Sequence, residues 1–358
     1  MQSLDTSTII SDFIVQFFGF LKSNTNPIII TSHKQADADS LGAGILIYHL
    51  IKTVSTSQVS LVFPSFSKQT ERIISSFSLE KLIKKDLDSG QDPENYCIIL
   101  VDTNQPAITD LNMIFRSGDS TEIFNSCKTR IIIDHHLQSE NSQQSIDFQL
   151  ILTSFNSASE LAYTLIKQST ITIADEVFLA LGLIGMLYDT KRLVLANARV
   201  LATVSDILSK TNKSIEDYLP YLDSEKDYSE RIANLKAAQR NKVVMLRDSY
   251  VVSLSFISSF ESSSARSLQY LGSDLAAVLN RGKKEVRISF RSSKKFHKET
   301  NIHCGELAQY LAEKFSGTGS GHTTAAGCNI AITSPNNDIF DAIIEYLEKQ
   351  IPDNIVTN

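Results

Sequence analysis

The 358-residue sequence contains no tryptophan and only four cysteines, and no two cysteines form a Cys-x-x-Cys pair. Scattered thiols argue against a disulfide framework and against a structural zinc site built from cysteine. No apolar run reaches the roughly 18 residues of a membrane span, and the N-terminus has an acid and several hydroxyls where a signal peptide would be basic. We therefore expect a cytoplasmic protein with no membrane association.

The net charge of −6 excludes the overall positive field of many nucleic-acid-binding proteins, so any contact with nucleic acid must be local. The chain is longer than one compact core usually requires, which favours two domains. Residues 206–245 read as a polar helical stretch, with a helix expected over 214–240. We predict a first domain over 1–205, a helical linker over 206–245 and a second domain over 246–358.

Short aliphatic segments alternate with helical segments in the first domain. This alternation predicts an α/β fold with a doubly wound parallel sheet. The second domain mixes strands and helices around a glycine-rich loop at 316–327, and we expect a smaller α/β domain. The predicted strands are 28–30, 58–63, 97–101, 130–133, 250–256 and 285–290, and the predicted helices are 9–22, 41–51, 79–87, 176–187, 273–280 and 306–315.

Acidic and imidazole side chains follow the predicted strands of the first domain. Ligands gather at the carboxyl ends of strands in open α/β sheets. Carboxylates and imidazoles without thiolates suit Mn²⁺, Mg²⁺ or Zn²⁺. Helix caps and core histidines could explain single members, but not their repetition at strand ends. The set comprises His33, Asp37, Asp39, Asp102, Asp134, His135, His136 and Asp189.

These positions resemble the four ordered motifs of the DHH phosphoesterases, and 157–161 is similar to the small-residue segment before the fourth motif. Downstream, residues 291–293 and 319–327 resemble the signature of the associated DHHA1 domain. The resemblance covers about residues 28 to 330. It implies a two-domain, Mn²⁺-dependent phosphodiesterase of the RecJ and nanoRNase branch, with its active site in a cleft between the domains.

The resemblance also implies roles for single residues. Two Mn²⁺ ions are expected, with Mg²⁺ as the alternative, and a bridging hydroxide would attack phosphorus. Asp134 would orient a ligand imidazole, and His136 would face the scissile phosphate or act as a nearby acid. The first loop reads Gln-Ala-Asp-Ala-Asp where the family more often has Asn-Pro-Asp-Gly-Asp, but every ligand position is kept. One ion would take His33, Asp37 and Asp102, and the other Asp39, Asp102, His135 and Asp189, with Asp102 as the bridge.

The second domain carries a basic stretch at 281–298, in which eight lysines and arginines face one acid. Such a concentration in an acidic chain indicates a phosphate-binding face. An arginine can grip a phosphate through two parallel hydrogen bonds, and glycines let backbone N–H groups approach an anion. The glycine-rich loop departs from the family at Ser320, where glycine is commoner. The expected substrate contacts are Arg291, Ser292, Gly319, Ser320, Gly321 and His322.

The leading functional hypothesis is an exonuclease that releases nucleoside 5′-monophosphates from short single-stranded RNA or DNA. Hydrolysis of cyclic dinucleotides, their linear products or 3′-phosphoadenosine-5′-phosphate is the alternative. Pyrophosphatase and exopolyphosphatase activities are less favoured because those relatives have a different second domain. A replication or repair partner that has lost its metal ligands is a different class, and the complete motif set argues against it. A homodimer and a replication or repair protein partner both remain open.

Overall fold

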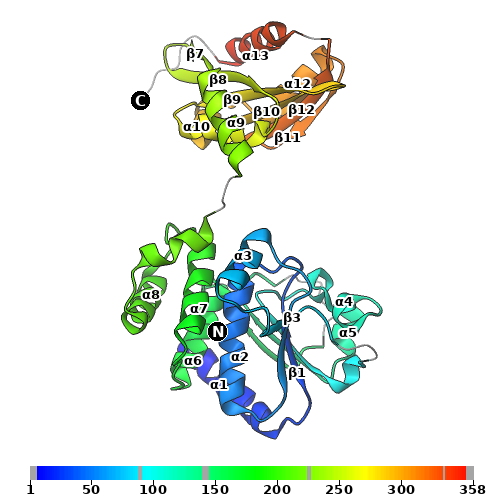
Figure 1. The fold of residues 1–358 in the computed structure, drawn as a ribbon, viewed down its shortest axis with the longest axis vertical. Coiled ribbons are helices and arrows are strands. Elements are labelled where there is room, and N and C mark those ends of the chain that lie inside the picture. Colours follow the sequence, from blue (N-terminus) through cyan, green and yellow to red (C-terminus); the bar gives the residue numbers. More distant parts are fainter. Residues whose placement is uncertain (1–5, 88–90, 139–144, 224–226, 334, 352–358) are drawn as a thin grey trace, which may run out of the picture. The chain divides into compact units, whose positions relative to one another are not determined.

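The computed structural model describes residues 6–87, 91–138, 145–223, 227–333 and 335–351 (Figure 1). The chain divides into two compact units, Met1–Ser224 and Glu225–Asn358. Within the described ranges, no helix combines the length and the apolar character that a membrane crossing requires.

The first unit is built on a six-stranded sheet in which every pairing is parallel, with the strand order β3-β2-β1-β4-β5-β6. This is the doubly wound order, whose direction reverses between β1 and β4. The predicted parallel sheet is confirmed. Its strands are β1 Ile28–Thr31, β2 Val59–Val62, β3 Ile83–Lys84, β4 Cys97–Val101, β5 Thr129–Asp134 and β6 Phe148–Ile151.

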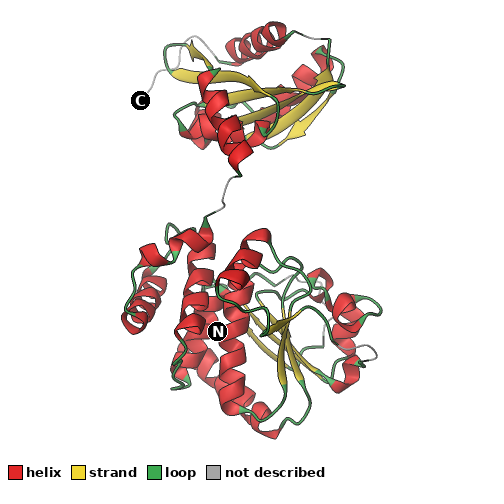
Figure 2. Ribbon diagram, in the orientation of Figure 1, coloured by secondary structure: helices red, strands yellow, loops and turns green. Residues whose placement is uncertain are grey.

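Helices cover both faces of this sheet (Figure 2). Alternate side chains of one strand enter different cores: Ile28 and Ile30 of β1 pack in the larger core, and Ile29 packs in the smaller core. Because both faces are buried, the strands read as unbroken aliphatic runs. The larger core holds α1 Thr6–Ser23, α2 Ala38–Val54, α6 Ala158–Gln168, α7 Glu176–Asp189 and α8 Ala198–Thr211; the smaller holds α4 Leu111–Phe115 and α5 Ser120–Ser126.

One predicted helix of the first unit is wrong. Residues 79–87 form a turn and the short edge strand β3 in place of a helix, whereas a helix, α3, lies just upstream at Lys68–Ser76. Its first residues follow Ser67, whose hydroxyl accepts a hydrogen bond from the backbone N–H of Thr70. That N-cap signal is the feature that marks the true helix start.

Helices α2 and α7 pack against each other at glycine. A Cβ atom on Gly42 would lie 2.6 Å from the carbonyl oxygen of Leu181, and one on Gly182 would lie 2.8 Å from the Leu46 side chain. A Cβ on Gly185 would meet the Ser159 hydroxyl and would lie 2.9 Å from Asp39 Oδ1. The close approach of these helices therefore depends on the absence of side chains, and it sets the position of Asp39.

The second unit contains a six-stranded mixed sheet with the order β11-β12-β10-β9-β8-β7, in which β8 and β9 are parallel and the other pairs antiparallel. Helices α9 and α10 pack on one face, and α11, α12 and α13 on the other. The strands are β7 Lys242–Leu246, β8 Tyr250–Ile257, β9 Leu275–Arg281, β10 Glu285–Ser292, β11 Thr318–Gly321 and β12 Ala325–Ala331; the helices are α9 Tyr228–Gln239, α10 Glu261–Tyr270, α11 Lys294–Thr300, α12 Cys304–Lys314 and α13 Asn336–Gln350.

Two predictions for this unit are wrong. The predicted helix at 273–280 is the strand β9, whose residues are buried on both faces up to Asn280, so they lack the alternation that identifies a half-buried strand. The predicted loop at 316–327 is largely a hairpin, because Thr318–Gly321 pairs with β12. Its glycines allow close packing of strands as well as loop conformations.

The predicted helical linker at 206–245 is not a separate element. Helix α8 ends at Thr211, and the single-turn segments Ile215–Asp217 and Leu219–Leu222 follow it. Tyr218 and Leu222 belong to the larger core of the first unit. Helix α9 packs with α10 in the second unit through Ala233 and Ala237. The division therefore falls at 224/225 and replaces the predicted boundaries at 205 and 245.

Substitution Gly185→Ala should destabilise the first unit by about 1–3 kcal/mol, because the new methyl group would overlap Ser159 and crowd Asp39. The control is Gly19→Ala on exposed α1, where nothing lies within 4 Å of the added Cβ. Helix propensity alone predicts a gain there of about 0.5–1 kcal/mol. Calorimetric unfolding of both variants measures the difference, and equal stability of the two would contradict the close packing of α2 and α7.

Candidate functional site

The predicted metal-binding residues of the first unit lie at the carboxyl end of its sheet. His33 follows β1, Asp102 follows β4, and Asp134 ends β5. Asp37 caps α2, where its Oδ1 accepts hydrogen bonds from the backbone N–H groups of Asp39 and Ser40. Parallel strands bring these loops to one edge. The same edge receives Asp189 from the last turn of α7 and His135 from the loop after β5.

Asp102 lies between two groups of donors. Its backbone has a φ of 58°, a left-handed conformation that Asp adopts more readily than most residues. Its Oδ2 accepts a hydrogen bond of 2.7 Å from Ser40 and lies 3.5 Å from His33 Nε2. Its Oδ1 lies 3.4 Å from His135 Nε2. Each carboxylate oxygen therefore faces a different group of donors, so Asp102 could contribute to both.

The first group consists of His33, Asp37 and Asp102, each with a donor atom within 4.8 Å of the others. The separation between His33 Nε2 and Asp37 Oδ2 is 3.9 Å. His33 Nδ1 donates a hydrogen bond of 2.8 Å to the carbonyl oxygen of Lys34. This hydrogen bond fixes the ring and turns Nε2 toward the carboxylates.

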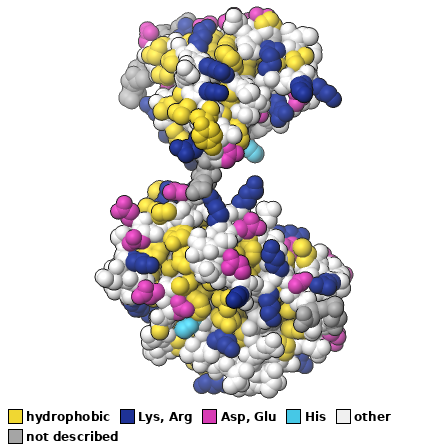
Figure 3. Space-filling view, in the orientation of Figure 1, with side chains coloured by type: hydrophobic (Ala, Val, Ile, Leu, Met, Phe, Trp, Pro, Cys, Tyr) yellow, Lys and Arg dark blue, Asp and Glu magenta, His cyan; other side chains and the backbone are white. Residues whose placement is uncertain are grey.

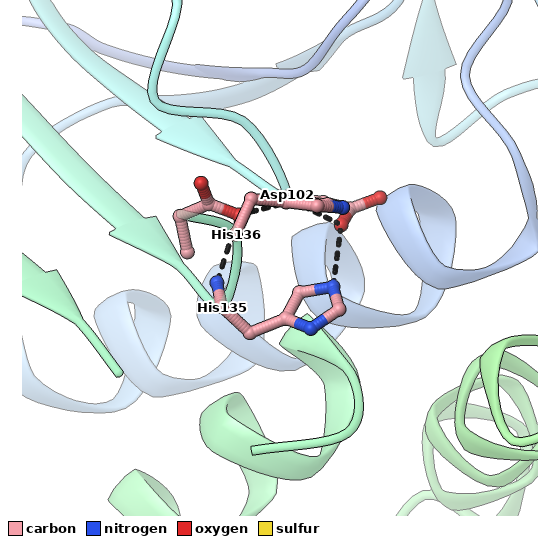
Figure 4. A group of neighbouring side chains, drawn as sticks. Asp102, His135 and His136 are labelled. Atoms are coloured by element: carbon pink, nitrogen blue, oxygen red, sulfur yellow. Dashed lines mark hydrogen bonds and ion pairs between the residues drawn. The ribbon is translucent and has the colours of Figure 1, made fainter. Parts of the chain in front are cut away.

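The second group consists of Asp39, Asp102, His135 and Asp189, again within 4.8 Å of one another. His135 Nε2 lies 3.2 Å from Asp189 Oδ2 and 3.9 Å from Asp39 Oδ2. The imidazoles of His135 and His136 both point toward Asp102 (Figure 4). The buried Asp39 carboxylate also accepts hydrogen bonds from the backbone N–H groups that begin α6, where a helix favours negative charge.

The carboxylates repel one another, and this repulsion contributes to the raised pKa values of Asp37 and Asp39. Burial, reinforced by the charge of Asp102, raises the pKa of Asp37 to about 6 and raises that of Asp39 well above its usual value. The hydrogen bond to Asp102 raises the pKa of His33 to about 9. Burial opposes protonation of His135, but its carboxylate neighbours outweigh that effect and raise its pKa to about 11. The protein alone compensates these charges with protons on the imidazoles.

Divalent cations fit this donor set better than protons do. Asp102 Oδ1 and His135 Nε2 are buried and form no hydrogen bond within the described part of the chain. Such atoms are costly unless a partner satisfies them. Carboxylate and imidazole donors without thiolates are those of Mn²⁺, Mg²⁺ and Zn²⁺. Three such groups occur among the described residues: two have the same members as the two ligand sets that the resemblance implies, and the third joins Asp102 and His135 to Asp134 and His136.

Asp134 is arranged differently from the expectation that it orients a ligand imidazole. Asp134 Oδ1 lies 2.8 Å from His136 Nδ1, so it orients His136 and not the ring of His135. Asp134 Oδ2 accepts a 2.7 Å hydrogen bond from Asn104 Nδ2, which also reaches the carbonyl oxygen of His136 at 3.2 Å. Asn104 and Ser40 were missed by the sequence analysis. Both residues could have been found from their positions in the sequence, since Ser40 lies three residues after Asp37 and Asn104 lies two residues after Asp102.

A cavity of about 610 Å³ opens at these groups. Of the expected residues, Asp39 and Asp134 are buried behind its wall, and the others line it. The remaining lining comes mainly from the loop after β4. The residues that line the cavity are His33, Asp37, Asp102, Thr103, Asn104, Gln105, Ile108, His135, His136, Leu137, Thr153 and Asp189.

The second unit has its own cavity, of about 830 Å³, over the sheet of β10, β12 and β11. Arg287, Ser289 and Arg291 alternate along β10 and therefore project from the same face. The residues opposite Ser289 and Arg291 on β12 are Gly327 and Ala325, whose small size leaves space above the strands. The result is a hollow lined by two guanidinium groups, which suits an anion.

Arg291 is directed into this cavity by α10. Its Nη2 donates a 3.0 Å hydrogen bond to Ser262 Oγ, and its buried Nε has no hydrogen-bond partner among the described residues. Burial and the nearby charge of Arg266 lower the pKa of Arg291. The guanidinium therefore retains donor capacity for a ligand.

The other expected substrate contacts are divided. Gly319, Ser320 and His322 line the cavity, whereas Ser292 and Gly321 do not. Ser292 is buried next to the thiol of Cys304. Gly321 has a φ of 150°, and a Cβ there would overlap Ala326 on β12, so glycine serves strand packing at that position.

The basic stretch at 281–298, predicted to bind phosphate, contributes only some of its side chains to this cavity. Of its lysines and arginines, Arg287 and Arg291 line the cavity. Arg281 instead bonds to Asn336 and the carbonyl oxygen of Ile332. Basic and acidic side chains are interspersed on the visible face of each unit (Figure 3).

Comparisons with known proteins identify two domains. Residues 27–186 match the N-terminal domain of the DHH family, and residues 264–349 match the DHHA1 domain. An uncharacterized protein of Methanocaldococcus jannaschii is 28% identical over 310 residues, covering 84% of this chain and 86% of that protein. The crystal structure of an exopolyphosphatase-related protein from Bacteroides fragilis is similar, with a TM-score of 0.58, 20% identity and 98% of each chain covered. This last likeness establishes the shared fold.

Adding Mn²⁺ at about one hundred times its dissociation constant should raise the unfolding temperature of the first unit by about 5–10 °C, because the cation binds only the folded arrangement. Asp102→Asn should abolish most of this rise, since it removes the carboxylate common to both groups. Asp12→Asn, on exposed α1, is the matched control. Differential scanning fluorimetry with and without EDTA measures the shift, and an undiminished shift in Asp102→Asn would disprove the shared ligand.

Proposed function

The chain carries the two domains of the DHH phosphoesterases, and we propose that it is a phosphodiesterase that hydrolyses short single-stranded oligonucleotides to nucleoside 5′-monophosphates. The observation that carries the proposal is the pair of donor groups joined by Asp102, each of its oxygens facing one group. Mn²⁺ is the proposed ion at both groups, and Mg²⁺ is the alternative.

Two divalent cations held by these groups would lower the pKa of a water molecule and offset the negative charge that develops on a phosphoryl group. The protein would supply donor atoms in fixed positions. These atoms come from His33 and Asp37 on one side of Asp102, and from His135 and Asp189 on the other. Preorganised donors cost no rearrangement when the reaction occurs.

His136 is the proposed general acid. It is half exposed and lines the cavity, and its Nδ1 is held by Asp134. Because Asn104 in turn holds Asp134 and the carbonyl oxygen of His136, the ring has a fixed orientation. Its second nitrogen is left to donate a proton to the leaving oxygen, for which a distance of hydrogen-bond length is required.

The arginine cavity of the second unit is the proposed site for a phosphate away from the bond that is cut. Arg287 and Arg291 offer permanent positive charge, and Ser320 and His322 add polar groups. A dinucleotide or short oligomer carries such a second phosphate, whereas a single phosphomonoester does not, so a phosphate site of this kind favours the oligonucleotide.

The proposal is tested by incubating the purified chain with Mn²⁺ and end-labelled RNA and DNA of 2, 5 and 24 nucleotides. A cyclic dinucleotide, 3′-phosphoadenosine-5′-phosphate, pyrophosphate and polyphosphate are assayed in parallel. We expect mononucleotides from the 2- and 5-mers. Turnover confined to the 24-mer, or to one of the other compounds, would replace the proposed substrate, and no turnover of any of them would favour a partner protein without activity.

Asp102→Asn should lower kcat for the best oligomer by about a thousand-fold or more, because both donor groups lose their common ligand. Asp12→Asn should retain full activity. Steady-state rates under saturating Mn²⁺ measure this effect, and near-normal turnover by Asp102→Asn would refute the proposed centre.

Arg291→Ala should raise KM by about ten-fold or more with a smaller change in kcat, since a phosphate contact remote from the reacting atom contributes mainly to binding. Lys283→Ala provides the control, because Lys283 belongs to the same basic stretch but lies outside the cavity. Dinucleotide kinetics with both variants make the comparison. A larger KM effect in Lys283→Ala would place the phosphate elsewhere.

A further inference from the structure

Two exposed aliphatic side chains flank the metal-binding groups of the first unit. Ile108 is 45% exposed and Leu137 is 81% exposed, and both line the 610 Å³ cavity. Ile108 ends the single-turn segment Pro106–Ile108 after β4, and Leu137 follows the two histidines after β5. Large aliphatic side chains that are exposed to water contribute no burial free energy, but a ligand that covers them removes apolar surface from water and is stabilised by doing so.

The backbone at both positions is anchored to the catalytic loops. The carbonyl oxygen of Ile108 accepts a 2.8 Å hydrogen bond from the backbone N–H of Lys34, next to His33. The carbonyl oxygen of Leu137 lies 3.4 Å from Asn104 Nδ2, the amide that holds Asp134. Hydrogen bonds to the loops that carry the predicted catalytic groups therefore hold the backbone at these two residues.

The metal-site cavity also differs from the cavity of the second unit in charge. Among the described residues that line it, none is a lysine or an arginine, whereas Arg287 and Arg291 line the other. A phosphate next to the reacting one would thus find the imidazoles of the site but neither a lysine nor an arginine among the described residues that line the metal-site cavity. An inorganic phosphate chain carries such neighbouring charges, and it is poorly matched to two aliphatic groups.

We propose that Ile108 and Leu137 contact the nucleobase beside the reacting phosphate, and so select nucleotide diesters over inorganic phosphate chains. This inference rests on the proposed function and adds its specificity-determining residues. The base covers the two side chains and removes their apolar surface from water. Loss of such a contact typically changes kcat/KM by about ten-fold or more.

The test uses the 5′-phosphorylated dinucleotide pApA and two analogues in which one or the other adenosine is replaced by an abasic residue. Tripolyphosphate is the inorganic comparison. The variants are Ile108→Thr and Leu137→Asn, which keep a branched side chain but make it smaller and polar, and their combination. Leu201→Asn, half exposed on α8 and away from the cavity, is the control.

We expect wild type to hydrolyse pApA about ten-fold more efficiently than one of the abasic analogues, and tripolyphosphate poorly. The double variant should lose this ten-fold preference by becoming slower on pApA while its rate on that abasic analogue stays constant. An unchanged Mn²⁺-induced rise in unfolding temperature would show that the variants keep their donor groups. Leu201→Asn should behave as wild type in every assay.

Two kinds of failure can be told apart. If wild type hydrolyses no dinucleotide, the proposed function is wrong and the inference falls with it. If wild type hydrolyses pApA and both abasic analogues equally, the proposed function stands and the inference is wrong. A double variant that loses pApA and abasic activity in equal proportion would also overturn it, because the two side chains would then support something other than a base.

Discussion

Repulsion among the aspartates gathered at one edge of a parallel sheet is the constraint on which the first unit depends. Asp37 and Asp39 come from α2, Asp102 from the loop after β4 and Asp189 from the end of α7. In a partly dehydrated site such charges oppose one another strongly. The hydroxyl of Ser40 and the N-terminus of α6 offset part of this cost. The unsatisfied oxygen of Asp102 marks the part that only a cation can offset.

The packing of the helices is subordinate to this requirement. Asp39 reaches the donor group because α2 lies unusually close to α7, and glycines at 42, 182 and 185 permit that distance. Glycine costs about 1 kcal/mol of helix stability relative to alanine, so three of them in two helices oppose local propensity. Burial of the surrounding aliphatic side chains in the larger core compensates for that loss. The stability that the larger core provides therefore offsets the unfavourable free energy of gathering these charges at one site.

The metal-binding residues could be predicted because strand ends are visible in a sequence. Each aliphatic run such as 97–101 ends abruptly at a polar residue, and the parallel topology brings these polar residues to the same edge of the sheet. The partner of Asp134 could not be predicted, since Asp134-His135-His136 allows the carboxylate to reach either ring. Strand β9 was mistaken for a helix because burial on both faces removes the alternation of apolar and polar residues. The predicted linker was wrong for a related reason. Tyr218 and Leu222 look like ordinary helix residues in the sequence, and only the structure shows that they pack in the larger core of the first unit.

The two cavities solve different electrostatic problems. At the reacting phosphate, positive charge must sit close to several oxygens at once, and carboxylates are needed to hold the cations that supply it. Arginines there would pair with those carboxylates and weaken both. In the second unit Arg287 lies 3.4 Å from Glu285, whereas the buried Nε of Arg291 has no hydrogen-bond partner among the described residues, so Arg291 is the better placed of the two to hold a ligand. The proposed function thus assigns hydrolysis and the binding of a second phosphate to cavities of different charge, and among the described residues neither lysine nor arginine lines the cavity of Ile108 and Leu137.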